Sequence, residues 1–128
     1  MAYLEDLKDR IRAAYLKILE HKYSSSIHGK TLYCDSFLKI AVEVRNLINK
    51  AQHNGITTVF GIADFIIFNL LRTKYFVYEN HIMALFIGHL YLENQGVAHK
   101  FSVGNITDNS SIEEVSALTT SWQNIGDK

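Results

Sequence analysis

The chain has 128 residues, of which 48% are hydrophobic and 20% are charged, and thirteen basic side chains balance thirteen acidic ones. This length and composition predict one globular domain with a buried core, and they exclude disordered and collagen-like classes. A net charge of zero at pH 7 gives no reason to expect nucleic acid or an anionic membrane as the main partner, because both bind clustered positive charge.

The compartment predicted from the sequence is the cytoplasm. Cys34 is the only cysteine, so no intramolecular disulfide can form and a reducing interior is expected. Glu5 and Asp6 stand where a signal peptide would carry positive charge. The apolar run 59–71 contains Asp64 and is shorter than the ~20 residues that cross a bilayer. We therefore expect no membrane segment.

Apolar residues recur at helical spacing from the N-terminal region onward, and the chain contains no proline, which suits long helices. A first helix is expected over 3–21. It carries one apolar stripe, at alternating steps of three and four residues, made of Leu4, Leu7, Ile11, Ala14 and Ile18. We expect this stripe to pack in the domain's own core. The alternative is a homodimer joined through Leu4, Leu7, Ile11 and Ile18.

A polar connector that can be mobile is expected over 23–34, and a second helix over 36–53. Asn54 and Gly55 supply a stop signal for this helix. A third helix is expected over 59–73, where Thr57 or Thr58 can cap its start. Its side chains leave almost no polar face, which predicts a helix at the centre of the bundle.

Residues 74–80 form a joint that leads to a fourth helix. This helix is expected to begin at Asn80 or His81 and to end at Asn94 or Gln95, with Gly96 as a left-handed C-cap.

Residues 98–109 are expected to be a loop that contains a short extended piece at 100–103. A last helix is expected after Ser110 and Ser111, because each is followed three residues later by a glutamate, the spacing of a capping box. Residues 123–128 read as a polar tail. Together these elements predict an all-α fold, a single-domain bundle of five to six helices that spans 1–128.

The joint and the helix that follows it resemble the core of the Fic/Doc family. The shared positions keep the spacing of the family's H-x-F-x-x-x-N-K-R motif and of the helix behind it, and they are Phe76, Asn80, Ala84, Leu85, Leu90, Leu92, Gly96 and Val97. The resemblance covers about a third of the chain. It implies a Fic/Doc-like fold and a bacterial or phage system. Members of the Doc branch are toxins, each neutralised by a small antitoxin whose helix lies in a groove.

The chain departs from the family at the positions that carry the chemistry. Lys74 stands at the position of the catalytic histidine, and lysine is protonated at neutral pH and is therefore a poor general base. Tyr78 stands at the position of the acidic residue that helps to hold magnesium and phosphate. The two basic residues that follow the family's asparagine are matched by His81 and Ile82.

These departures predict a non-catalytic protein-binding module, a degenerate toxin domain that acts as an inhibitor, decoy or regulatory partner. No catalytic residue, metal or cofactor is expected under this interpretation. The first alternative is an active Doc-like nucleotidyl- or phosphotransferase that acts on a protein hydroxyl with ATP and magnesium, and that uses Glu79 or His81 as its base. The second alternative is a structural helical homodimer. Without any kinship, Phe76 is a core anchor and Asn80 is an ordinary N-cap.

Two sets of candidate site residues lie at the joint. Arg72, Lys74, Asn80 and His81 are a weak candidate for binding an anion or nucleotide together with the start of the fourth helix. Tyr75, Tyr78 and Glu79 are candidates for a protein interface, because tyrosine is frequent at interface hot spots.

Other chemistry has weaker support. The six histidines include no H-E-x-x-H or similar pairing, so no metal site is expected. Cys34 with His28 and Asp35 has the residue types of a nucleophile, a base and an orienting group. A lone cysteine is more often a small buried hydrophobe.

Overall fold

The computed structural model describes residues 2–23 and 36–123, and the regular elements of these ranges are five helices. In chain order they are α1 (Ala2–Tyr23), α2 (Phe37–His53), α3 (Val59–Thr73), α4 (Asn80–Asn94) and α5 (Ile112–Trp122). The all-α bundle predicted from the sequence is confirmed.

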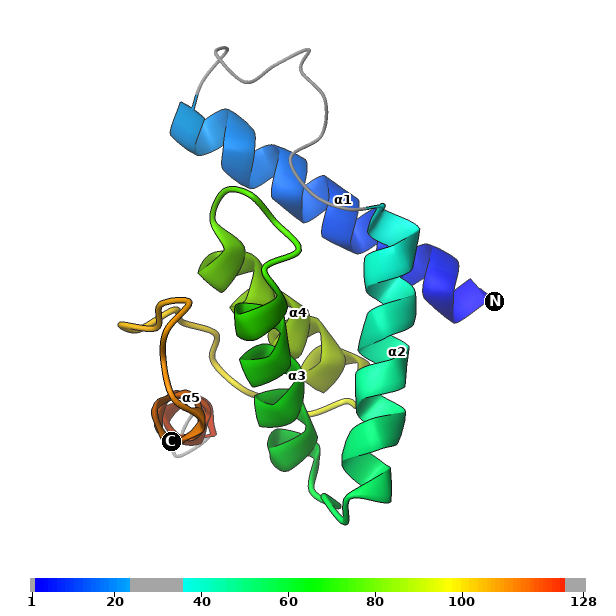
Figure 1. Cartoon of the computed structure of the whole chain (residues 1–128), viewed down its shortest axis with the longest axis vertical. Coiled ribbons are helices and arrows are strands. Elements are labelled where there is room, and N and C mark those ends of the chain that lie inside the picture. Colours follow the sequence, from blue (N-terminus) through cyan, green and yellow to red (C-terminus); the bar gives the residue numbers. More distant parts are fainter. Residues whose placement is uncertain (1, 24–35, 124–128) are drawn as a thin grey trace.

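Helix α3 is the centre of the bundle. It packs against α2, α4 and α5, while α1 crosses over the group and contacts α2 and a short part of α4 (Figure 1). The sequence of α3 explains its place, because a helix without a polar face must be covered by neighbours. Six of its side chains are buried: Ile62, Ala63, Ile66, Ile67, Leu70 and Leu71.

Local capping signals fix the starts of α2, α3 and α5. Ser36 accepts a hydrogen bond from the N–H of Lys39 at the start of α2, and Thr58 does the same for Gly61 in α3. At α5 the capping box is formed by Ser111 and Glu114. The predicted boundaries of α2 and α3 are therefore confirmed to within a residue.

The apolar stripe of α1 differs from the predicted one. Its buried side chains are Leu4, Leu7, Ile11, Tyr15 and Leu19, whereas Ala14 and Ile18 are only partly buried. The stripe drifts because a straight helix does not keep a strict seven-residue repeat. Leu4, Leu7 and Ile11 belong to the chain's own core, so of the residues proposed for a homodimer seam only Ile18 is left partly exposed.

The segment between α4 and α5 has neither helix nor strand at 100–103, where a short extended piece was expected. It is held against the end of α5. The N–H of Lys100 donates to the carbonyl of Trp122 at 3.2 Å, and the indole N–H of Trp122 donates to the carbonyl of Ser102 at 3.1 Å.

Several predictions fall on residues outside the described ranges. They are most of the connector 23–34, the grouping of Cys34 with His28 and Asp35, and the tail after Gln123. Among the helices that the structure does describe, none combines the length and the apolar character needed to cross a lipid bilayer.

A glycine sets the close approach of α3 and α4. A Cβ atom added at Gly88 would lie 2.5 Å from Cγ1 and 2.6 Å from Cδ1 of Ile67. Cγ1 is bonded to Cβ, and a β-branched residue in a helix strongly prefers one χ1 rotamer, so Cγ1 has little freedom to move and the two helices would have to shift apart.

We predict that Gly88→Ala lowers the free energy of unfolding by about 1–3 kcal/mol, because overpacking costs more than the gain in helix propensity. Urea unfolding followed by circular dichroism measures the change. In an Ile67→Ala background, which removes both close atoms, the same substitution should cost much less. Equal costs in the two backgrounds would show that the contact with Ile67 is not the cause.

Candidate functional site

The joint between α3 and α4 is held in a strained backbone conformation. Lys74 and Glu79, at its two ends, are the only described non-glycine residues with positive φ, at 56° and 58°. Side chains with a Cβ atom adopt this left-handed region at a cost of about 1 kcal/mol or more each. Such a conformation persists only where surrounding contacts hold it.

Asn80 supplies those contacts. Its side chain is 4% exposed and its oxygen accepts from the N–H of Phe76 at 3.2 Å. Its amide nitrogen donates to the carbonyl of Leu70 at 3.3 Å and to the Asp108 carboxylate at 2.9 Å. The interpretation of Asn80 as an N-cap is wrong, because Glu79 is the N-cap of α4 and its side chain makes no capping bond.

Arg72 joins the same network from the end of α3. Its guanidinium donates to the carbonyls of Asp108 and Ser110, both at 2.6 Å, and lies 4.5 Å from the centre of the Phe68 ring. The guanidinium therefore holds the loop before α5 against the end of α3, next to the joint.

The contacts of Arg72 and Asn80 involve two residues of the predicted anion site. Arg72 and Asn80 are brought together at Asp108, because Arg72 donates to its backbone carbonyl and Asn80 donates to its carboxylate. The chain's own groups thus engage the donors that an external anion would use: a carboxylate engages Asn80, and two backbone carbonyls engage Arg72. Lys74 is exposed and His81 is partly buried. Asp108 was missed in the sequence because an aspartate in a polar loop has no distinguishing spacing.

Two aromatic residues of the joint, Phe76 and Tyr78, contact Tyr15 of α1. The Phe76 ring is 2% exposed and packs edge-on against Tyr15, with 4.7 Å between ring centres. The Tyr15 hydroxyl accepts from the N–H of Tyr78 at 3.3 Å. Tyr75, Tyr78 and Glu79, the predicted interface residues, are partly buried.

Val77 is the apolar residue that the joint presents to solvent. It exposes 67% of its surface, more than any other large apolar residue in the described ranges. Sequence reasoning overlooked it in favour of its tyrosine neighbours, since valine at one loop position gives no pattern to detect.

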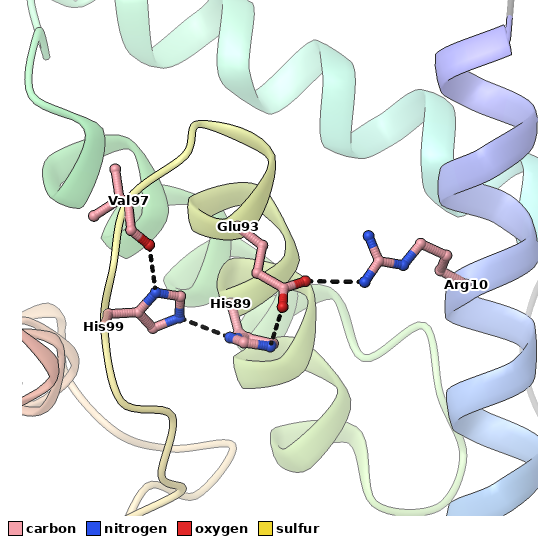
Figure 2. Close-up of polar contacts among 5 residues, drawn as sticks. All are labelled: Arg10, His89, Glu93, Val97 and His99. Carbon is pink, nitrogen blue, oxygen red and sulfur yellow. Dashed lines mark hydrogen bonds and ion pairs between the residues drawn. The ribbon is translucent and has the colours of Figure 1, made fainter.

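A second polar cluster joins α4 to α1 and to the segment after α4. Figure 2 shows a chain of contacts that runs from Val97 through His99, His89 and Glu93 to Arg10. The two imidazoles are 2.7 Å apart, between Nδ1 of His89 and Nε2 of His99. The Glu93 carboxylate lies 2.9 Å from Arg10.

The number of protons on the two imidazoles determines which contacts of this cluster can be hydrogen bonds. Nδ1 of His99 faces the carbonyl of Val97 at 3.1 Å, so this nitrogen must carry a proton. The imidazole pair needs one proton in its shared bond, and Nε2 of His89 needs another to bond Glu93, which is 3.7 Å away. Two neutral imidazoles hold two protons for three links. The pair therefore satisfies every acceptor only when it carries one extra proton.

Burial opposes that extra proton. It lowers the pKa of His89 below the ordinary histidine value, an effect that exceeds the opposing pull of the Glu93 carboxylate; His99 and Arg10 lower it further. At neutral pH the contact between Nε2 of His89 and the Glu93 carboxylate is the one left without a proton, which agrees with its distance of 3.7 Å. Within the described ranges, no three histidine, cysteine or acidic side chains converge as a metal site would require.

Comparison with known proteins finds no match to this chain, whether among family models, curated proteins or solved structures. The resemblance to the Fic/Doc family stays a prediction based on sequence positions.

The Asn80 network predicts a charge effect. Asn80→Asp removes both donors and places a carboxylate beside that of Asp108, which disfavours ionisation of both. We expect a loss of about 3–5 kcal/mol in the free energy of unfolding at pH 7, measured by urea unfolding. The double variant Asn80→Asp, Asp108→Asn restores one donor and acceptor and should recover much of the loss. No recovery would mean that the two side chains are not coupled.

The histidine pair predicts a pH effect. Because the pKa of His89 is lowered in the folded state, the unfolded chain binds the proton more tightly. The contribution of neutral His89 to the free energy of unfolding is therefore fully present above the ordinary histidine pKa of ~6.5. This contribution falls as the pH decreases towards the pKa of His89 in the folded state. His89→Gln should reduce the drop in urea midpoint between pH 7.5 and pH 5.

His21→Gln is the matched control, since His21 is exposed and should leave the drop unchanged. An undiminished drop in the His89 variant would contradict the assignment.

Proposed function

We propose that this chain is a non-catalytic protein-binding module, a degenerate Fic/Doc-like domain that acts as an inhibitor, decoy or regulatory partner in a bacterial or phage system. The observation that carries the proposal is the joint between α3 and α4. It is firmly anchored, yet it presents an apolar side chain, Val77, to solvent.

The anchoring supports binding because it reduces the entropy lost on association. A loop already held in one conformation has less freedom to lose when a partner docks. Phe76 is fixed against Tyr15, and Asn80 is fixed by three hydrogen bonds. Backbone strain of the kind found at Lys74 and Glu79 is concentrated at functional sites in proteins.

The residue types at the joint support binding over catalysis. Lys74, Tyr78, His81 and Ile82 replace the histidine, acid and two basic residues of the family motif. The Asn80 side chain is engaged by Asp108, so a nucleotide phosphate there would meet a carboxylate. Both features disfavour the phosphoryl chemistry of the family.

Replacing Val77 with aspartate tests the proposal. The variant should keep its fold, because the side chain is mostly exposed, and should bind the protein partner at least tenfold more weakly. Affinity capture from a cell lysate with mass spectrometry identifies proteins retained by the wild-type chain, and titration of the purified partner gives the dissociation constants. Leu38→Asp is the control, because Leu38 is also exposed, at 42%, but lies on α2, outside the joint. This substitution should leave the affinity unchanged.

Equal affinity of the partner for wild type, Val77→Asp and Leu38→Asp would contradict the proposal. Transfer of label from ATP to a retained protein in the presence of magnesium would replace it with the transferase alternative.

A further inference from the structure

A cavity lies between α1, α4 and the segment that follows α4. Its volume is about 520 Å³, within the range of roughly 300–1,000 Å³ found for small-molecule sites. Its walls are Ala14, Ile18, Ile82, Phe86 and Phe101, and its remaining lining residues are Lys17 and His21. The walls come from three separate elements, so the cavity is a product of the tertiary fold.

Among the described lining residues, those with polar or charged side chains both come from α1. Lys17 and His21 are one helical turn apart on α1, whereas α4 and Phe101 contribute only apolar side chains. No carboxylate is among the described lining residues. Neither the Lys17 side chain nor the His21 side chain has a hydrogen bond or ion pair with any residue in the described ranges. Lys17 therefore places a positive charge at the edge of an almost wholly apolar surface, without an ion-pair partner in the described ranges, and such an edge is complementary to an anion.

We propose that this cavity binds an amphiphile with an anionic head, a medium- to long-chain carboxylate. The hydrocarbon chain packs against Ile18, Ile82 and Phe86, and the carboxylate lies beside Lys17. A partner helix in the same place would need polar partners along both rims, as interfaces have a polar rim around an apolar core. In the part of the chain that the structure describes, the lining offers polar side chains on the α1 side alone. This site is separate from the joint and goes beyond the protein-binding function.

Isothermal titration calorimetry with decanoate tests the proposal on the full chain. We expect saturable one-to-one binding, and decyltrimethylammonium, with the same chain and the opposite charge, should bind at least tenfold more weakly. Comparing octanoate, decanoate and laurate should show binding that tightens up to about fourfold per methylene until the cavity is filled.

Two variants, Lys17→Glu and Ala14→Phe, separate the contribution of the charged head group from that of the hydrocarbon chain. Lys17→Glu should weaken decanoate about three- to tenfold and improve binding of the cationic amphiphile, whereas Arg12→Glu, on the opposite face of α1, should change neither. Ala14→Phe fills the cavity and should abolish binding of all chains. Both Lys17 and Arg12 are exposed, so the charge variants keep the fold.

The proposal is overturned if decanoate gives no saturable heat, if both head groups bind equally, or if Lys17→Glu and Arg12→Glu behave alike. Binding of an acidic amphipathic peptide with no binding of decanoate would also overturn it, and would assign the cavity to a protein partner. Val77→Asp should leave decanoate binding intact, so failure here is distinguishable from failure of the joint as a protein interface.

Discussion

The requirement to cover the apolar side chains of α3 governs the arrangement of the described elements. A helix this apolar cannot face water, and α2, α4 and α5 each bury part of it. Its few polar side chains need partners of their own. Asn69 donates to the carbonyl of Phe65, and the Asp64 carboxylate accepts from the Thr119 hydroxyl. Burial still raises the pKa of Asp64 above its ordinary value, despite the hydrogen bonds from α5 that oppose the rise. Of these polar groups, Asn69 is thus satisfied within α3 itself, and Asp64 is satisfied by α5.

The joint inherits its shape from this arrangement. Its own residues do not favour the conformation, since two of them lie in the left-handed region without being glycine. The conformation is set by Asn80, by the Arg72 contacts with the loop before α5, and by Tyr15 on α1. Three elements distant in sequence therefore define one short loop.

Local signals in the sequence were enough to place the helices. Caps at Ser36, Thr58 and Ser111 fixed boundaries because each acts on the residues next to it.

The sequence could not reveal contacts between distant positions. Arg10 and Glu93 are separated by 83 residues, and Asn80 and Asp108 by 28. Asn80 was ambiguous for a physical reason: the same side chain can cap a helix or enter the core, and only the position of Asp108 decides between them. The cavity was also invisible, since Ala14 and Ile18 fit a core stripe equally well.

The position of Trp122 gives the molecule a built-in optical reporter. It is the only tryptophan in the chain, and its indole lies 5.7 Å from the His99 ring and 5.3 Å from the Phe101 ring, measured between ring centres. One neighbour belongs to the histidine pair and the other to a wall of the cavity. Indole emission responds to nearby charge and polarity, so the unlabelled protein carries a spectroscopic signal that senses both places at once.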